Sequence, residues 1–108
     1  MEFGLKLSIK ERLVLLGILP KEGDFITLKI VRQLRENLSF NEEELKRYNI
    51  QISDGKVTWD PSAEQLKELR MGERARGVLI DRLEELNTSK KLNDDLFTVY
   101  EKFVARKK

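Results

Sequence analysis

Two segments of this chain repeat one order of apolar and basic residues. The first reads LKLSIKERLVLLGIL, from Leu5 to Leu19, and the second reads LRMGERARGVLIDRL, from Leu69 to Leu83, 64 positions later. The matched pairs are Leu5 with Leu69, Lys6 with Arg70, Leu7 with Met71, Lys10 with Arg74, Arg12 with Arg76, Val14 with Val78, Leu15 with Leu79, Leu16 with Ile80 and Leu19 with Leu83. A repeat of this kind predicts two copies of one structural unit, each of which needs the other to cover its apolar surface.

Each copy begins as a strand followed by a helix. Phe3, Leu5 and Leu7 alternate with other residues, which predicts a strand with one buried face. Ser8 and Glu11 have the spacing of a capping box, and the helix that they start must end before Pro20. In the second copy Leu69 and Met71 match Leu5 and Leu7, which predicts a strand there as well. A helix from about 73 to 86 follows.

A second helix follows in each copy. Thr27 or Asp24 can cap the first of these helices, and its apolar stripe is Ile30, Val31, Leu34 and Leu38. Asn93 caps the other, which holds Leu96, Phe97, Tyr100, Phe103 and Val104. An offset of 66 pairs Thr27 with Asn93 and aligns the two stripes. Chance similarity of amphipathic helices is the alternative, but it explains the order of strand, cap and basic residues less well than duplication does.

The segment between the copies predicts a short helix and a hairpin. Ser39 and Glu42 are placed to cap an acidic helix, NEEELKRY. In IQISDGKVTWD, Asp54 and Gly55 suit a two-residue turn that places Ile52 opposite Val57 and Ile50 opposite Trp59.

We therefore predict a single α+β domain over residues 1–108 that is mainly helical. Its pseudo-repeats span about 3–38 and 67–104 and are linked by residues 41–60. A small antiparallel sheet would include the hairpin at about 50–59 together with the two repeat strands.

The composition argues against catalysis. The 108 residues include no cysteine and no histidine, which removes the thiolate nucleophile, the commonest general base and the commonest transition-metal ligand. The acidic runs NEEE and NDDL lie at helix starts, where capping explains them without a metal. We therefore expect a non-enzymatic protein with no cofactor and no metal. The apolar run 13–19 is too short to span a bilayer and no signal peptide is evident, so we expect a cytoplasmic location.

Basic residues matched between the two copies are the candidate binding surface. The set comprises Lys6, Lys10, Arg12, Arg70, Arg74 and Arg76. Paired guanidinium groups can grip a carboxylate or phosphate, although solvated helix flanks paired with nearby glutamates would give the same pattern. Self-association is expected through apolar surface left on the helices at 13–19 or 96–104, and another protein is the other expected partner.

Nucleic acid is the less favoured partner. Three helices from Ser8 to Tyr48 and then a hairpin have the order of a winged helix, but the third helix begins with acidic residues that phosphates would repel. A formal charge of +2 is also small for a nucleic-acid binder. Lys29, Arg32 and Arg35 on the second helix offer another basic row, which no aromatic or amide residue is expected to accompany.

One long stretch of the chain resembles known sequences. LVLLGILPKEGDFITLKIVRQLRENLSFNEEE, together with the later GKVTWD, is similar to small proteins of unknown function encoded in bacteriophages and prophages. The resemblance covers most of the chain. It implies a phage context, the cytoplasm of a host cell and an accessory role such as binding a host or phage protein, and it carries over no activity and no functional residue.

Overall fold

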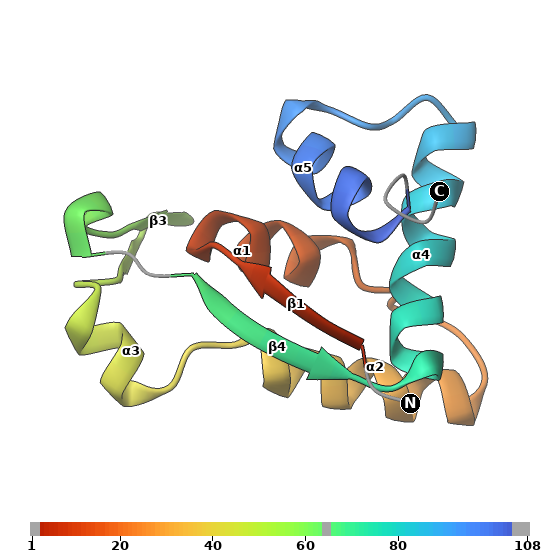
Figure 1. Cartoon of the computed structure of the whole chain (residues 1–108), viewed down its shortest axis with the longest axis horizontal. Helices are drawn as coiled ribbons and strands as arrows, with labels where there is room; N and C mark the ends of the chain where they lie inside the picture. The colour runs from red at the N-terminus through yellow and green to blue at the C-terminus, as the bar shows by residue number, and fades with distance from the viewer. Residues whose placement is uncertain (1–2, 64–65, 105–108) are drawn as a thin grey trace.

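The strand-helix-helix order occurs twice in the structure, with a short helix and a hairpin between the two occurrences (Figure 1). The computed structural model describes residues 3–63 and 66–104. The first unit is β1 (Phe3–Leu7), α1 (Ile9–Ile18) and α2 (Phe25–Leu38), and the second is β4 (Lys67–Met71), α4 (Glu73–Thr88) and α5 (Asp94–Phe103). Between them lie α3 (Glu42–Arg47), β2 (Gln51–Ser53), β3 (Lys56–Thr58) and the 3₁₀ turn η1 (Pro61–Ala63). The predicted class, α+β and mainly helical, is confirmed.

The two repeat strands pair with each other at the centre of the molecule. β1 and β4 are antiparallel, and the middle of their ladder is the pair Leu5–Leu69, which is also the first matched pair of the sequence repeat. The ladder ends at Phe3–Met71 and Leu7–Lys67, so each strand presents equivalent positions to the other. The two strands are therefore related as by a two-fold axis between Leu5 and Leu69.

The helices follow the same relation. α1 packs against α2 of its own unit and α5 of the other unit, and α4 packs against α5 of its own unit and α2 of the other. The first helix of each unit therefore contacts the second helix of both units. This equivalence supports our interpretation of the repeat as an internal duplication. Leucines and other apolar residues from both units form one core, whose fully buried members include Leu7, Leu15, Leu34, Leu79 and Leu83.

Two of the predicted helix starts are confirmed. Ser8 and Glu11 form the capping box of α1, with the Glu11 N–H donating to Ser8 Oγ at 3.1 Å and the Ser8 N–H donating to Glu11 Oε1 at 3.0 Å. Asn93 caps α5 through the N–H of Leu96. For α2 the structure selects Asp24 rather than Thr27, and the N–H of Thr27 is the donor to the Asp24 side chain.

The prediction that Ser39 and Glu42 cap the acidic helix is wrong. Asn41 and Glu44 form that capping box, and α3 begins at Glu42. Ser39 instead terminates α2, where its hydroxyl donates to the carbonyl of Arg35 at 2.6 Å. The physical reason is that α2 continues to Leu38, so Ser39 is too close to the preceding helix to start the next one.

The predicted offset of 66 between α2 and α5 is also wrong. The buried residues of α2 are Val31, Leu34 and Leu38, and those of α5 are Leu96, Val99 and Phe103. Their identical spacing gives an offset of 65. Phe97 consequently corresponds to an outward position of α2, and its side chain is 60% exposed.

The hairpin forms a sheet of its own within the described part of the chain, so its predicted union with the repeat strands is wrong. Its turn is as expected, because Asp54 and Gly55 both have the positive φ angles of a type I′ turn and Ile52 lies opposite Val57. Pro61 starts the 3₁₀ turn that separates the hairpin from β4. The hairpin and α3 lie at the left end of the molecule in Figure 1, far from α4.

Candidate functional site

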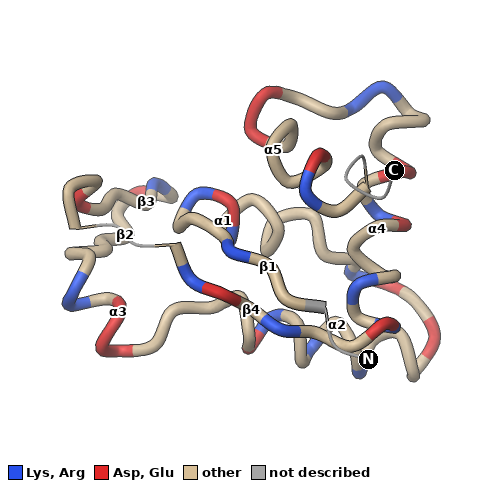
Figure 2. Tube along the Cα trace, viewed as in Figure 1, with Lys and Arg blue, Asp and Glu red and all other residues tan. Residues whose placement is uncertain are grey.

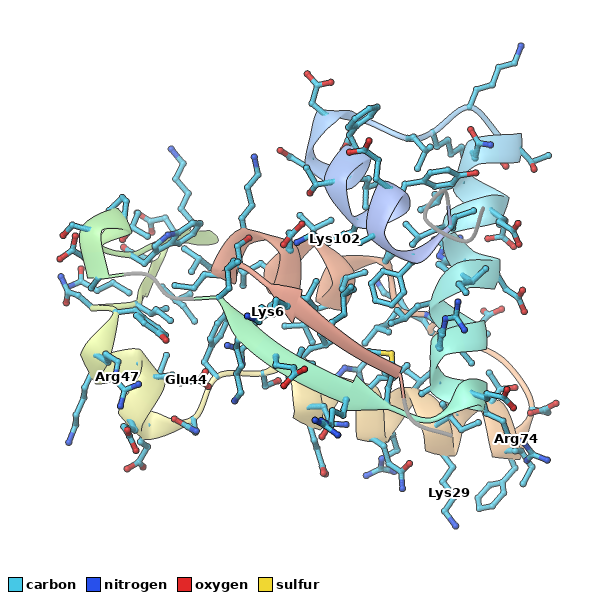
Figure 3. The ribbon with its side chains drawn as sticks, in the orientation of Figure 1. Lys6, Lys29, Glu44, Arg47, Arg74 and Lys102 are labelled. Atoms are coloured by element: carbon cyan, nitrogen blue, oxygen red, sulfur yellow. The ribbon has the colours of Figure 1, made fainter. Side chains whose placement is uncertain are left out.

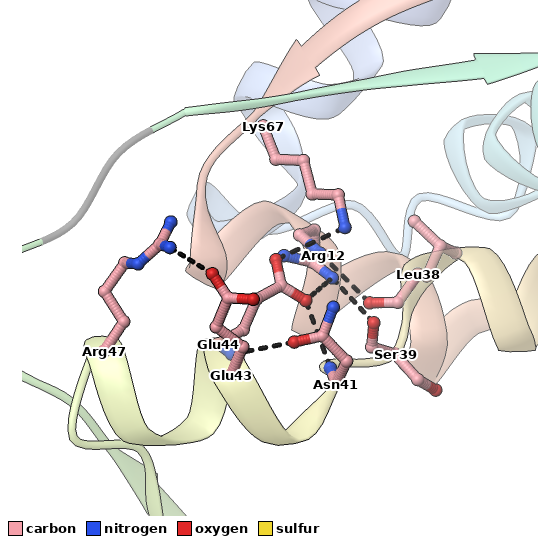
Figure 4. A network of polar contacts seen from close by, with 8 residues as sticks. All are labelled: Arg12, Leu38, Ser39, Asn41, Glu43, Glu44, Arg47 and Lys67. Atoms are coloured by element: carbon pink, nitrogen blue, oxygen red, sulfur yellow. Dashed lines mark hydrogen bonds and ion pairs between the residues drawn. The ribbon is translucent and has the colours of Figure 1, made fainter.

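Among the residues that the structure describes, Arg12 is the most deeply buried polar one, at 1% exposure, and it joins three segments of the first half of the chain (Figure 4). Its Nη1 and Nη2 atoms donate to the two carboxylate oxygens of Glu44 at 2.8 and 3.2 Å. Its Nε atom donates to the carbonyl of Leu38 at 3.1 Å, and Nη2 also donates to the carbonyl of Ser39 at 2.6 Å. The guanidinium lies over the ring of Phe40, 4.1 Å from its centroid. Arg12 thus ties α1 to the end of α2 and to α3.

Glu44 is held ionised by this network. Burial opposes its charge, but hydrogen bonds from Arg12 and from the N–H of Asn41, with the charges of Arg12 and Lys67, lower its pKa to about 2. Lys67 of β4 lies 3.4 Å from the carboxylate and links the network to the central sheet. Neither Arg12 nor Glu44 has a buried side-chain nitrogen or oxygen without a hydrogen-bond partner, so we interpret the network as structural.

A second ion pair fixes α5 to α1. Lys102 donates to Glu11 Oε1 at 2.7 Å and to the carbonyl of Lys6 at 3.0 Å. Burial acts to raise the pKa of Glu11, but hydrogen bonds from Lys102 and from the backbone of Ser8 lower it below its ordinary value. Like the Arg12 network, this ion pair links parts of the fold to each other, and we interpret it as structural.

The structure does not gather the six predicted basic residues into one surface. Arg12 is not part of any surface, because its side chain is buried and its partners lie inside the molecule. Lys10 is exposed and pairs with Asp95 at 2.8 Å, and Arg76 is partly buried in α4. Lys6 and Arg70 lie on the exposed face of the central sheet, where Lys6 is opposite Glu68. Figure 2 shows basic and acidic residues interspersed along the chain.

Arg74 is the exception, because it lines the same cavity as Lys29 of α2. A cavity of about 490 Å³ between α2 and the start of α4 is lined by Ile26, Lys29, Gln33 and Arg74, among others. Figure 3 shows Lys29 and Arg74 at the same edge of the molecule, whereas Lys6 lies over the centre of the sheet. The inter-unit contact of α4 with α2 brings Arg74 to this place.

A second cavity lies along the outer face of α2. The lining of this cavity of about 600 Å³ includes the apolar residues Pro20, Phe25 and Leu28 together with basic side chains and one acidic residue. The charged residues are Lys21, Lys29, Arg32, Arg35 and Glu36. Phe25 is 77% exposed and the adjacent Ile26 is 51% exposed. We call Phe25, Lys29, Arg32, Gln33 and Arg35 the α2 face.

The α2 face corrects one expectation about the basic row of this helix. Lys29, Arg32 and Arg35 were expected to lack an aromatic or amide neighbour, but Phe25 and Gln33 line the same cavity as all three. Phe25 lies one and two helical turns before Lys29 and Arg32, which places the three side chains in one row. The sequence signal was present: Phe25 follows the capping residue Asp24 and falls outside the buried stripe.

Within residues 3–63 and 66–104, no group of three or more acidic side chains is arranged to hold a metal ion. None of the helices that the structure describes is both long and apolar enough to cross a membrane. Comparison with protein-family models, with curated proteins and with solved structures gives no significant match to the chain.

Proposed function

We propose that this chain is a non-enzymatic protein-binding module and that the α2 face is its contact surface. The observation that carries the proposal is the exposure of Phe25, 77%, beside a cavity whose lining includes apolar residues. Leaving a phenylalanine in water forgoes about 2 kcal/mol of transfer free energy, and aromatic residues with arginine are enriched where proteins meet. A surface that combines an exposed aromatic side chain with arginines therefore has the composition of a small protein interface.

The resemblance to phage proteins supports an accessory role in the cytoplasm of a host cell, with a host or phage protein as partner. The candidate residues from the repeat contribute to this proposal only through Arg74, which lines the cavity of about 490 Å³ together with Lys29. Lys6, Lys10, Arg70 and Arg76 are dispersed, and Arg12 is internal.

A comparison of two single substitutions tests the proposal. Phe25→Ser removes the aromatic side chain of the α2 face, and Ile52→Ser removes a side chain of similar exposure, 74%, from the distant hairpin. Each tagged variant would be used to capture proteins from a lysate of the source cells, with bound proteins quantified by mass spectrometry. We expect at least one protein to be captured by the wild type and by Ile52→Ser but at least tenfold less by Phe25→Ser. Capture of the chain itself is compared in cells whose untagged copy carries the same substitution as the tagged one. Equal capture by all three proteins would overturn the proposal.

A DNA-binding regulator is the alternative, and the same basic row favours it. Lys29, Arg32, Arg35 and Arg74 are exposed on one side of the molecule, as phosphate contacts must be. The third helix does not support a winged-helix reading, because α3 has only six residues and its inward carboxylate, Glu44, is bound by Arg12. Binding to duplex DNA that weakens steeply with salt and is lost in Arg32→Glu would favour this alternative over protein binding.

A further inference from the structure

The outer face of α5 carries the opposite charge to the α2 face. Its exposed row is Asp94, Phe97 and Glu101, one helical turn apart, and Phe97 in the middle is 60% exposed. Figure 2 shows the acidic start of α5 and the basic stretches of α2. The two helices occupy equivalent places in the two units, so the fold presents a basic aromatic face at one position and an acidic aromatic face at the other.

The dimensions of the two rows match. Lys29 and Arg35 are six positions apart and Asp94 and Glu101 are seven apart, which is about 9 and about 10 Å along a helix. The α2 cavity of about 600 Å³ has room for an aromatic side chain, and basic residues are among those that line it. Phe97 is such a side chain, and it has a carboxylate about one turn away on either side.

One chain cannot satisfy this complementarity by itself. Figure 1 places α2 along the bottom of the molecule and α5 along the top, with the central sheet and α1 between them. The two faces can meet only if they belong to different copies. Such a contact is heterologous, because it leaves the acidic face free on one copy and the basic face free on the other, and it leads to a ring or an open chain of copies.

We propose that the α2 face binds the acidic face of α5, formed by Asp94, Phe97 and Glu101, on a second copy of this chain. This inference rests on the proposed function, because it names the partner of the α2 face. A contact between two single helices buries a small area, so the affinity is expected to be weak and to fall as salt screens the charges.

A charge exchange tests the inference. Lys29→Glu/Arg32→Glu makes both faces acidic, and Asp94→Lys/Glu101→Lys makes both faces basic. We expect the average mass of the wild type, measured by analytical ultracentrifugation at low salt, to rise with concentration up to about 1 mM, where contacts of millimolar Kd are well populated. Each double variant alone should stay monomeric, and an equimolar mixture should associate again because both contacts become complementary. The matched control, Lys46→Glu/Lys56→Glu, alters the net charge as much as the first variant and should associate like the wild type.

Phe97→Ser provides a test that does not depend on the folding of the charge variants. It removes an exposed side chain, and we expect it to abolish association while the circular dichroism spectrum stays unchanged. A wild type that remains monomeric at about 1 mM, or a mixture of folded charge variants that fails to associate, would overturn the inference. If the wild type is monomeric but Phe25→Ser still loses a captured protein, the inference fails and the proposed function stands. If Phe25→Ser captures every protein as well as the wild type does, the proposed function fails.

Discussion

Removal of the Arg12 side chain should be among the most damaging single changes in this protein. Arg12→Met keeps much of the apolar stem but leaves the Glu44 carboxylate, 7% exposed, without its main partner, and leaves the carbonyls of Leu38 and Ser39 without donors. Breaking a buried ion pair from one side costs about 3–5 kcal/mol. The pKa of Glu44 gives a similar magnitude, because its fall from 4.5 to about 2 corresponds to about 3 kcal/mol in favour of the ionised form.

Urea unfolding at pH 7, followed by circular dichroism, measures this loss directly. A domain of this size has a free energy of unfolding of about 5–15 kcal/mol, so Arg12→Met should shift the urea midpoint strongly or leave the protein partly unfolded. Arg12→Met/Glu44→Leu should cost less than the two single changes added together, because the double change buries no unpaired charge. Arg47→Met, which breaks only the exposed pair with Glu43, should leave the midpoint nearly unchanged. If Arg12→Met lowers the free energy of unfolding by less than about 1 kcal/mol, the structural role assigned to Arg12 is refuted.

Four further outcomes follow from the structure. Because the folded-state pKa of Glu44 lies below its unfolded value, its contribution is complete above about pH 4.5 and is lost as the pH falls toward 2, so Glu44→Gln should flatten the stability profile there; equal acid slopes would refute this. Asn41→Ala should cost about 1 kcal/mol of stability in urea and Glu42→Ala should cost less, since Asn41 is the cap of α3; the reverse order would restore Ser39 and Glu42 as the capping box. Lys102→Met should lower the thermal midpoint more than Lys10→Met, because Lys102 binds a buried carboxylate and a strand carbonyl; equal midpoints would contradict it. Phe25→Ser should leave the thermal midpoint unchanged, and a marked fall would mean that Phe25 belongs to the core.

The local features of the fold could be predicted because short-range chemistry determines them. Ser8 and Asn93 have the side chains and spacing of helix caps, Pro20 ends a helix, and Asp54–Gly55 tolerates the φ angles of a tight turn. The strand at Leu69 was resolved by its match to Leu5, and the structure pairs these same two residues.

The long-range pairing of charges could not be predicted in this way. Arg12 and Glu44 are 32 residues apart, and nothing in the local pattern distinguishes Arg12 from the exposed Lys10. Helical periodicity placed Arg12 on a flank of α1, but only the position of α3 shows that the flank is covered. The repeat did not predict the burial of Arg12 either. Its partner Glu44 belongs to α3, which follows only the first unit and lies far from α4, the helix of Arg76.

The α2 face was missed for a different reason. The predicted binding surface consists of basic residues that match between the two copies of the repeat, whereas Phe25 has no counterpart in the second copy. Its exposure depends on where α2 begins, since capping by Asp24 rather than Thr27 adds a turn that carries Phe25 and Ile26 beyond the core. The face therefore depends on a choice between two capping residues that the sequence left open.

Photo-crosslinking from single positions tests the α2 face as the contact surface most directly. A photoreactive residue at Gln33, which lines both cavities of α2, would be compared in source cells with the same residue at Lys6, on the exposed face of the central sheet. The proposal predicts a discrete protein adduct from position 33 and none from position 6. An adduct from position 6 alone would contradict it and return the binding surface to the matched basic residues of the repeat.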